Sequence, residues 1–254
     1  MKILVTVKQV PDPTIQQSLE GDNTIARDRE VVLDPGDESG IESALQVKEK
    51  DGGSEVVLLS MGPDRARDAI RKGLSMGADR AILVTDDSLA GADALLTAKV
   101  LAAAIKQESP DLVISAVESY DGSTGMVPPM LAELLGLPQL TFAKHLEVDG
   151  GKVTVHRQTE DGHQVVEAQA PVLVTVTAGI AEPRYASLKG IMAARSKEIK
   201  QLAASDLGIE KGRPAEALKE VAQAEARKAG EIVEDDGTSG VDKIVAVLQT
   251  AKVI

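Results

Sequence analysis

The chain has 254 residues, enough for one large α/β domain or for one domain with an extension. One Phe, two Tyr and no Trp leave little aromatic surface for stacking bases, and a net charge of −12 repels phosphate backbones and anionic lipids, so we expect neither a nucleic-acid partner nor direct membrane contact. Without cysteine there is no disulfide, thiolate nucleophile or Cys-ligated metal cluster, so any redox centre must be a bound cofactor.

The apolar start of the chain has the length of a strand. Residues 3–7 run directly into Lys8, whereas a signal peptide places its basic residues before a longer apolar run and a small-residue cleavage site. No window approaches the roughly 20 apolar residues of a spanning helix. We therefore expect a cytoplasmic protein, or one in a compartment like the mitochondrial matrix if a presequence was removed.

Short β-branched runs that are apolar on both faces alternate with segments of helical periodicity. The predicted strands are residues 3–7, 56–60, 81–84 and 112–116. The predicted helices include Ile41, Ala44 and Leu45, then a run that ends at Gly77, then residues 95–105 before Pro110. This alternation predicts a parallel sheet covered by helices, the architecture of flavodoxin-like and Rossmann-like nucleotide-binding domains.

After Pro138 the periodicity changes to two. Turn signals at residues 149–151 and 161–162 separate strand-like stretches around Leu146, residues 153–157 and residues 165–168. These stretches predict antiparallel hairpins added to the sheet, followed by a last apolar strand at 172–177.

The last fifty residues are charged and punctuated by glycine. We expect a polar helix at residues 215–229 and a short amphipathic end at 241–253, neither of which buries much surface alone. This predicts an α/β domain over residues 1–204 and a C-terminal arm over 205–254 that packs on another subunit. Composition is almost equally compatible with a flexible linker carrying a docked helix.

Ligands of an open parallel sheet bind beyond the carboxyl ends of its strands. Four loops are predicted there: residues 8–12, 61–63, 85–88 and 117–125. The last contains Asp-Gly-Ser-Thr-Gly at 121–125 just before an apolar helical run, so flexible glycines, two hydroxyls and a helix N-terminus coincide, which attracts phosphate. By itself this pentapeptide is better explained as an ordinary capped turn. The chain has neither a Walker lysine nor a G-x-G-x-x-G motif.

Two other patterns do not predict a site. Residues 73–77 read Gly-Leu-Ser-Met-Gly, as in the nucleophile elbow of α/β-hydrolases, but they close a predicted helix instead of joining a strand to one. His145, His156 and His163 lie in the hairpin region without the spacing of a metal motif, so we expect solvent-facing residues and no metal.

Several motifs in order along the chain resemble one family. They are Val-Lys-Gln-Val-Pro-Asp at 7–12, Gly-Ala-Asp-Arg at 77–80, Leu-Gly-Leu-Pro-Gln at 135–139 and Glu-Pro-Arg-Tyr-Ala-Ser-Leu at 182–188. With their spacing, they resemble the beta (small) subunits of electron-transferring flavoproteins across nearly the whole chain.

The resemblance implies a heterodimer in which a large (alpha) subunit carries most contacts to a redox-active FAD, while this chain braces it and binds AMP structurally. The cofactor-binding residues implied by position are Thr6, Asp34, Pro35, Gly36, Asp37, Met61, Glu118, Asp121, Gly122, Ser123, Thr124, Gly125, Met126 and Val127. No residue is expected to be catalytic, because the chain would be a subunit of an electron carrier and not an enzyme.

The sequence departs from the family pattern at two places. Pro128 and Pro129 cannot donate backbone N–H groups, so phosphate contacts must come from residues before them. Pro13 stands where some relatives have a tyrosine near the flavin. Some branches of the family place a second FAD in the AMP site and split electron pairs; an electron-bifurcating or nitrogen-fixation-type carrier is therefore an alternative, as is a stand-alone adenine-nucleotide-binding module.

The segment 182–197 has two interpretations. Residue types alone favour a structural connector with Leu188 in the core. The resemblance instead implies a recognition loop that docks on acyl-CoA and related flavin dehydrogenases, with electrons passing on to a quinone oxidoreductase. The residues implied in recognition are Glu182, Pro183, Arg184, Tyr185, Leu188, Ile191 and Met192.

Overall fold

The computed structural model describes residues 1–20, 24–28, 30–209, 214–216, 218–222, 230, 232, 237 and 239–254. The chain divides into two compact units, Met1–Lys219 and Glu220–Ile254, which are described separately.

The first unit is built on one sheet of nine strands in the order β11-β5-β4-β1-β6-β10-β7-β8-β9. The pairs from β11 to β7 are parallel, and β7-β8 and β8-β9 are antiparallel. The strands are β1 (Lys2–Thr6), β4 (Glu55–Met61), β5 (Arg80–Val84), β6 (Leu112–Ala116), β7 (Gln139–Asp149), β8 (Lys152–Thr159), β9 (Gly162–Gln169), β10 (Val172–Val176) and β11 (Ile199–Leu202). The predicted α/β fold with a parallel sheet and antiparallel hairpins is confirmed.

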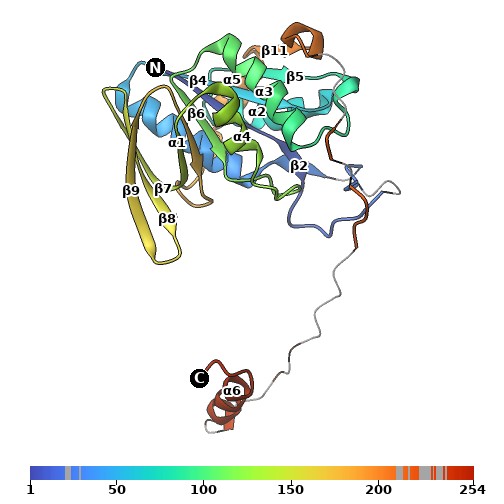
Figure 1. Ribbon diagram of the computed structural model, residues 1–254, viewed down its shortest axis with the longest axis vertical. Coiled ribbons are helices and arrows are strands. Elements are labelled where there is room, and N and C mark those ends of the chain that lie inside the picture. Colours follow the sequence, from blue (N-terminus) through green and yellow to red (C-terminus); the bar gives the residue numbers. More distant parts are fainter. Residues whose placement is uncertain are drawn as a thin grey trace. The chain divides into compact units, whose positions relative to one another are not determined.

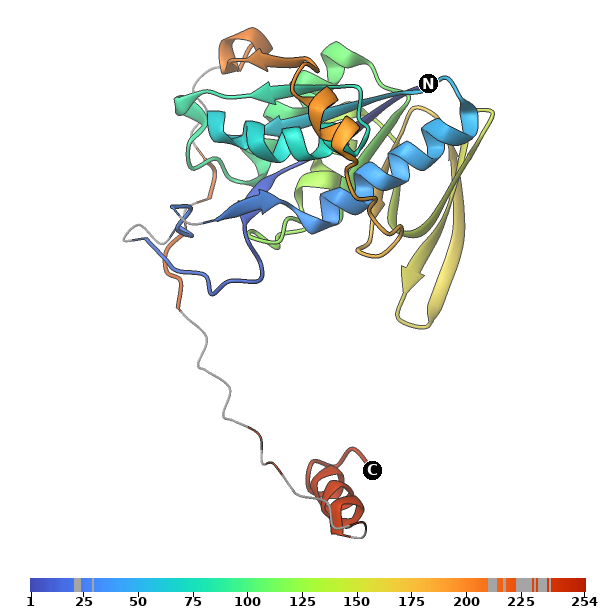
Figure 2. The ribbon, with the colours of Figure 1, turned by 180° about the vertical axis from the view of Figure 1, so that it is seen from behind.

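Helices cover both faces of this sheet, as Figures 1 and 2 show from opposite sides. On one face lie α1 (Pro35–Asp51) and α2 (Arg67–Met76), and on the other lie α3 (Ala94–Glu108) and α4 (Val127–Leu135). Successive side chains of a strand point to opposite faces, so Ile3 and Val5 pack towards α1, whereas Leu4 packs towards α3. The central strands need apolar residues at every position because both faces are buried.

The Gly-Leu-Ser-Met-Gly sequence closes α2, as predicted, and has a packing role. A β-carbon at Gly73 would lie 2.7 Å from a methyl of Leu58 and 2.8 Å from one of Ile41. Only glycine lets α2 approach β4 and α1 this closely, and Gly77 then ends the helix with φ +141°.

Strand β7 connects the parallel sheet to the hairpins. Its first half pairs with β10 and its second half with β8, and the register shifts between Ala143 and His145. Phe142 has φ +54° at this irregularity and its N–H donates to Thr175 Oγ1 at 2.8 Å. In the hairpins the His156 ring stacks on His163 at a centroid distance of 5.0 Å and lies tilted against His145 at 4.9 Å. His145 and His163 are exposed, as expected, whereas His156 is half-buried.

Three strands were not predicted. Strands β2 (Gln9–Pro11) and β3 (Val31–Leu33) form a small antiparallel sheet, and β11 extends the main sheet beside β5. The short helix α5 (Leu188–Ala194) packs on α2. Two 3₁₀ turns, η1 (Asp64–Ala66) and η2 (Asp87–Leu89), follow β4 and β5, and η3 (Ala204–Leu207) packs on α3.

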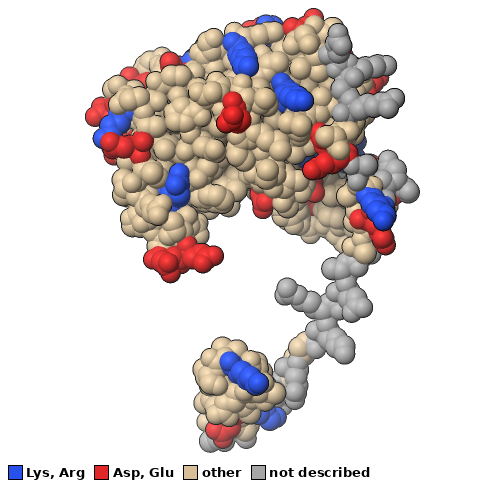
Figure 3. Space-filling view, viewed as in Figure 1, with Lys and Arg blue, Asp and Glu red and all other residues tan. Residues whose placement is uncertain are grey.

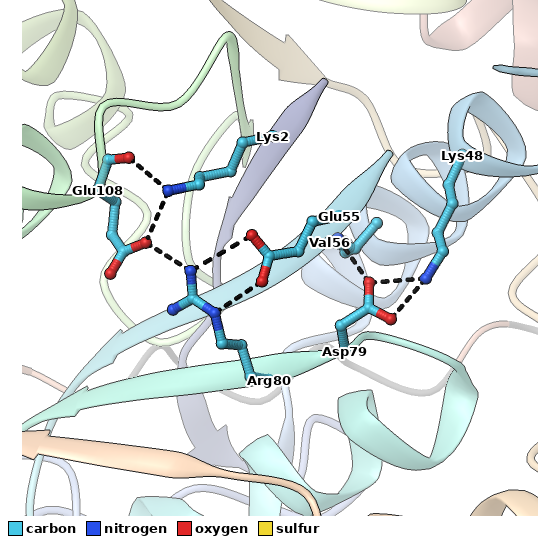
Figure 4. Close-up of polar contacts among 7 residues, drawn as sticks. All are labelled: Lys2, Lys48, Glu55, Val56, Asp79, Arg80 and Glu108. Atoms are coloured by element: carbon cyan, nitrogen blue, oxygen red, sulfur yellow. Dashed lines mark hydrogen bonds and ion pairs between the residues drawn. The ribbon is translucent and has the colours of Figure 1, made fainter. Parts of the chain in front are cut away.

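The Gly-Ala-Asp-Arg motif ties strands together at the amino edge of the sheet (Figure 4). Arg80 donates to Glu55 at 2.8 Å and to Glu108 at 2.6 Å, and Glu108 also pairs with Lys2 at 3.3 Å. Asp79 accepts from the Val56 N–H at 2.8 Å and from Lys48 at 2.6 Å. These contacts join β1, β4 and β5 to α1 and α3, which makes the motif structural and distant from the opposite, carboxyl edge.

This network predicts a pH-dependent stability. Hydrogen bonds from Arg80 lower the pKa of Glu108 below 4.5, so the folded state binds this proton more weakly than the unfolded state. The ionised Glu108 carboxylate therefore contributes its full stabilisation above pH 4.5, and this stabilisation is lost as the pH falls through the lowered pKa. We expect Glu108→Gln to reduce the free energy of unfolding by about 2 kcal/mol near neutral pH and progressively less in acid, measured by urea unfolding.

The exposed pair of Lys50 and Glu147, 3.0 Å apart, provides the control. Glu147→Gln is expected to leave the free energy of unfolding almost unchanged at any pH, because solvent screens this exposed ion pair. A stability loss in Glu108→Gln that is the same at neutral and acid pH would contradict the assigned role of its charge.

The second unit contains one helix among its described residues, α6 (Ser239–Thr250). Its apolar residues Val241, Ile244, Val245 and Leu248 recur at helical spacing, and the first three are exposed. Of the helix predicted over 215–229, residues 215–216 and 218–222 are irregular, and the rest lies outside the described residues.

Candidate functional site

The carboxyl ends of β1 and β6 meet where the winding of the sheet reverses. From β1 the chain adds β4 and β5 on one side, and then crosses to add β6 and β10 on the other. This switch point between β1 and β6 is where open α/β sheets bind ligands. Thr6 at the end of β1 donates through Oγ1 to Ser115 Oγ at 2.9 Å, which links the two strands beneath the crevice.

Two buried aspartates at the start of α1 line this switch point. Asp34 caps the helix by accepting from the Gly36 N–H at 2.9 Å, and its other oxygen accepts from the Tyr120 N–H at 2.7 Å. Asp37 lies in the first helical turn and accepts from the Lys8 N–H at 2.7 Å. Burial raises the pKa of both carboxyls, and the charge of Asp34 raises that of Asp37 further.

A third carboxylate, Asp121, holds two cations at the same place. Lys8 Nζ lies 2.7 Å from Asp121 Oδ1, and Arg27 forms an ion pair with the other oxygen. Burial alone would raise the pKa of Asp121, but these two cations outweigh it and lower the pKa. The side chain of Asp121 is only 4% exposed, and it holds both cations beside the loop while offsetting one of their two charges.

The loop between β6 and α4 presents unpaired backbone donors to the crevice. Ser123 and Gly125 have φ values of +45° and +61°, the left-handed backbone conformation that occurs in anion-binding nests of successive N–H groups. Within the described residues, the N–H groups of Gly122, Thr124 and Gly125 donate to no protein acceptor. The N-terminus of α4 has no side-chain cap, and Pro128 and Pro129 carry no N–H there. An anion at this loop is therefore reached by residues 122–127.

The other predicted cofactor-binding residues surround this loop. Pro35 and Gly36 begin α1, and Gly36 approaches the end of β6 so closely that an added β-carbon would lie 3.1 Å from Ala116 Cβ. Met61 ends β4, while Glu118 and Met126 are exposed on the loop. The structure thus brings the residues predicted from four separate stretches of chain, Thr6, 34–37, Met61 and 118–127, to the same edge of the sheet.

Lys8 and Arg27 belong to this site but were absent from the predicted residues. Lys8 lay within a predicted loop, yet nothing local indicates that it pairs with Asp121, which is 113 positions away. Arg27 also donates to the Gln9 carbonyl at 3.1 Å, and Tyr120 donates to the Pro13 carbonyl at 3.4 Å. These contacts attach the segment before β3 to the loop after β6.

Four of the seven predicted recognition residues, Tyr185, Leu188, Ile191 and Met192, form an exposed apolar face, whereas Glu182 is an exposed charge and Pro183 and Arg184 are half-buried. Leu188 is 75% exposed and Tyr185 is 94% exposed. Ile191 and Met192 are also exposed and lie three and four positions after Leu188, on the same side of α5. The interpretation of Leu188 as a core residue is wrong, because Ala194 is the residue of α5 that is buried.

The remaining surface offers other features. On the face seen in Figure 3, Lys and Arg side chains are scattered singly, and acidic ones gather at the tip of the hairpins, where Glu160 and Asp161 form the turn. The hairpins also carry a hollow of about 390 Å³ beside the stacked histidines. In the part of the chain that the structure describes, no helix has the length and apolarity to span a bilayer, and no three His, Asp or Glu side chains are arranged to hold a metal.

Comparison with known proteins identifies the family of the chain over nearly its whole length. The family model of the electron transfer flavoprotein domain matches residues 22–207. The chain is 42% identical to the electron transfer flavoprotein subunit beta of Mycobacterium leprae over 271 residues, covering 99% of both chains. It is 38% identical to the subunit of the same name from Megasphaera elsdenii over 270 residues, covering all of both. The protein therefore belongs to the family of electron transfer flavoprotein beta subunits.

Proposed function

We propose that this chain is the small subunit of a heterodimeric electron carrier, which braces the FAD of an alpha subunit and binds AMP at the switch point. The observation that carries the nucleotide proposal is the loop 122–127, where free N–H groups, an uncapped helix N-terminus and two cations converge. Backbone donors and a helix N-terminus are suited to a phosphate. The chain adds no reacting group, so it holds cofactors and does not itself perform the redox chemistry.

The adenosine part of the nucleotide is proposed to lie between the ends of β1, β4 and β6. Thr6 and Met61 end two of these strands, and the first turn of α1 closes the side with Asp34 and Asp37. These groups supply hydrogen-bond acceptors for the ribose and apolar contact for the base.

The exposed face of segment 182–197 is proposed to dock on partner flavin dehydrogenases such as those of acyl-CoA. A cluster of apolar side chains rimmed by charges is typical of a small interface with a few dominant contacts. Here Leu188 is the apolar centre and Lys189 adds a neighbouring charge. Electrons taken up by the FAD are proposed to pass on to a quinone oxidoreductase.

The nucleotide content of the purified complex tests this proposal. We expect denaturation of the complex with the alpha subunit to release one FAD and one AMP, identified by chromatography against standards. The site is tested with a Gly125→Ala variant, because a side chain is strained at φ +61° and the loop backbone with its free N–H groups must shift. We expect that variant to lose AMP while FAD is largely retained.

If a second FAD occupies the site instead of AMP, the nucleotide content of the complex will differ. Two FAD and no AMP per complex would reject the AMP proposal and support an electron-bifurcating carrier. A stable chain that shows no affinity for any alpha subunit would instead support a stand-alone nucleotide-binding module.

A further inference from the structure

The docking segment is attached to the α/β body by a charge clamp. Arg184 donates through Nε to Glu42 Oε2 at 2.7 Å and through Nη2 to Glu42 Oε1 at 3.0 Å. Its other edge reaches Glu49, with Nη1 to Oε1 at 2.5 Å and Nη2 to Oε2 at 3.2 Å. Glu42 and Glu49 lie seven positions apart on α1, two turns along one side of the helix, so one planar guanidinium spans both.

The clamp is partly sheltered from solvent. The side chain of Glu42 is 5% exposed and also accepts from Gln46 Nε2 at 3.0 Å, which fixes its orientation. The backbone N–H of Arg184 points to the same carboxylate at 3.3 Å. Main chain and side chain of one residue therefore bind one buried anion, which fixes the direction in which the chain enters the segment.

The far end of the segment is attached to α2. Arg71 donates to the carbonyls of Ala194 and Lys197, and Lys197 Nζ donates to those of Leu74 at 3.0 Å and Ala78 at 2.5 Å. Gly190 sits so near α2 that an added β-carbon would lie 2.5 Å from the Ser75 carbonyl oxygen. These contacts hold the base of α5, and none involves the exposed apolar side chains.

We infer that Arg184, through Glu42 and Glu49, is a positioning residue that holds the docking face in its binding-competent arrangement before a partner arrives; this rests on the docking proposed above. Tyr185 and Leu188 follow the clamp by one and four positions and make almost no contact with the body themselves. Their direction is set by the residues on either side. A segment held in this way does not lose its conformational freedom at docking, so the clamp favours association without contacting the partner.

The test uses the complex with its alpha subunit as the electron acceptor of a dehydrogenase. In Arg184→Lys the ammonium cannot span two carboxylates, and in Glu42→Gln the buried charge is removed while an acceptor remains. We expect each variant to raise the KM for the complex about tenfold and to change kcat by no more than about twofold. The reason is that docking must then order roughly one more residue of backbone, which weakens association by about that factor. Lys50→Gln removes the exposed ion pair to Glu147 on the same helix and is the matched control, with KM unchanged.

Amide hydrogen exchange measures the opening of the docking segment without a dehydrogenase. The Gly190 and Ile191 amides donate to Ser187 at 3.1 and 2.9 Å at the start of α5, so their exchange reports opening of the segment. We expect faster exchange at these amides in both clamp variants, with exchange in the body of α1 as in the unchanged protein.

Leu188→Ala separates this inference from the docking proposal. If that change raises KM while Arg184→Lys and Glu42→Gln alter neither KM nor exchange, the clamp is overturned and docking stands. If Leu188→Ala leaves KM unchanged, docking at this face is rejected, and unchanged exchange in the clamp variants would then overturn the clamp as well.

Discussion

Leu188→Ala is expected to slow electron transfer from dehydrogenases about thirtyfold at low concentrations of the complex, through weaker association. Leu188 projects from the first position of α5 and is 75% exposed in this chain, so a docked partner removes most of its side chain from water. Burial of a leucine side chain contributes on the order of 2 kcal/mol, which corresponds to about thirtyfold in affinity. The measurement is the rate of flavin reduction by a dehydrogenase as a function of complex concentration.

The folding of Leu188→Ala provides the control. A residue exposed in the free chain adds little to the core, so the melting temperature of the complex and its nucleotide content should stay unchanged. Truncating a buried leucine would instead lower stability by roughly 2–5 kcal/mol. A marked fall in melting temperature with an unchanged reduction rate would show that Leu188 packs within the complex and that docking occurs elsewhere.

Removal of residues 237–254 is expected to weaken the heterodimer about a hundredfold or more. We propose that α6 packs its apolar stripe on the alpha subunit, because Val241, Ile244 and Val245 are exposed and the described part of its own unit offers nothing to cover them. Burying such a stripe contributes on the order of 3 kcal/mol after the cost of ordering is subtracted. Subunit affinity measured by dilution, together with flavin retention, checks this expectation.

Single substitutions on α6 test whether the apolar stripe itself, and not merely the presence of a C-terminal tail, contributes to subunit affinity. Ile244→Asp places a charge on the apolar side and should reproduce most of the loss. Lys243→Gln changes the polar side and should leave affinity unchanged. A truncated chain that binds the alpha subunit as tightly as the full chain would show that the C-terminal segment is no arm.

The sheet could be predicted where burial is symmetrical. Residues of β1 and β6 are apolar on both faces, a pattern that only a covered parallel strand requires, so these strands were found to within one residue. β11 was not found because it is an edge strand of sequence Ile-Lys-Gln-Leu, with two polar residues between the apolar ones. β2 contains Pro11 and is three residues long, so its pairing with β3 depends on tertiary contacts that no short window contains.

The candidate site could be predicted where local backbone chemistry marks it. Glycines before an apolar helix indicated the loop 121–125, although the pentapeptide alone was better explained as a capped turn, and the loop lies after β6 with Ser123 and Gly125 at positive φ. The charges around it depend on pairings between residues 94 and 113 positions apart, for Arg27 and Lys8 with Asp121, which a single sequence does not reveal. The clamp of Arg184 likewise joins residues separated by 142 and 135 positions.

The position of β1 at the centre of the sheet has a consequence for synthesis of the protein. This strand is synthesised before its neighbour β6, which starts at Leu112. At about 5–20 residues per second, the backbone edge of β1 that pairs with β6 waits roughly 5–20 s for that partner. During that interval the nascent chain carries an unpaired strand edge that is open to other chains. Factors that shield nascent chains are therefore expected to influence the yield of this subunit before any alpha subunit is met.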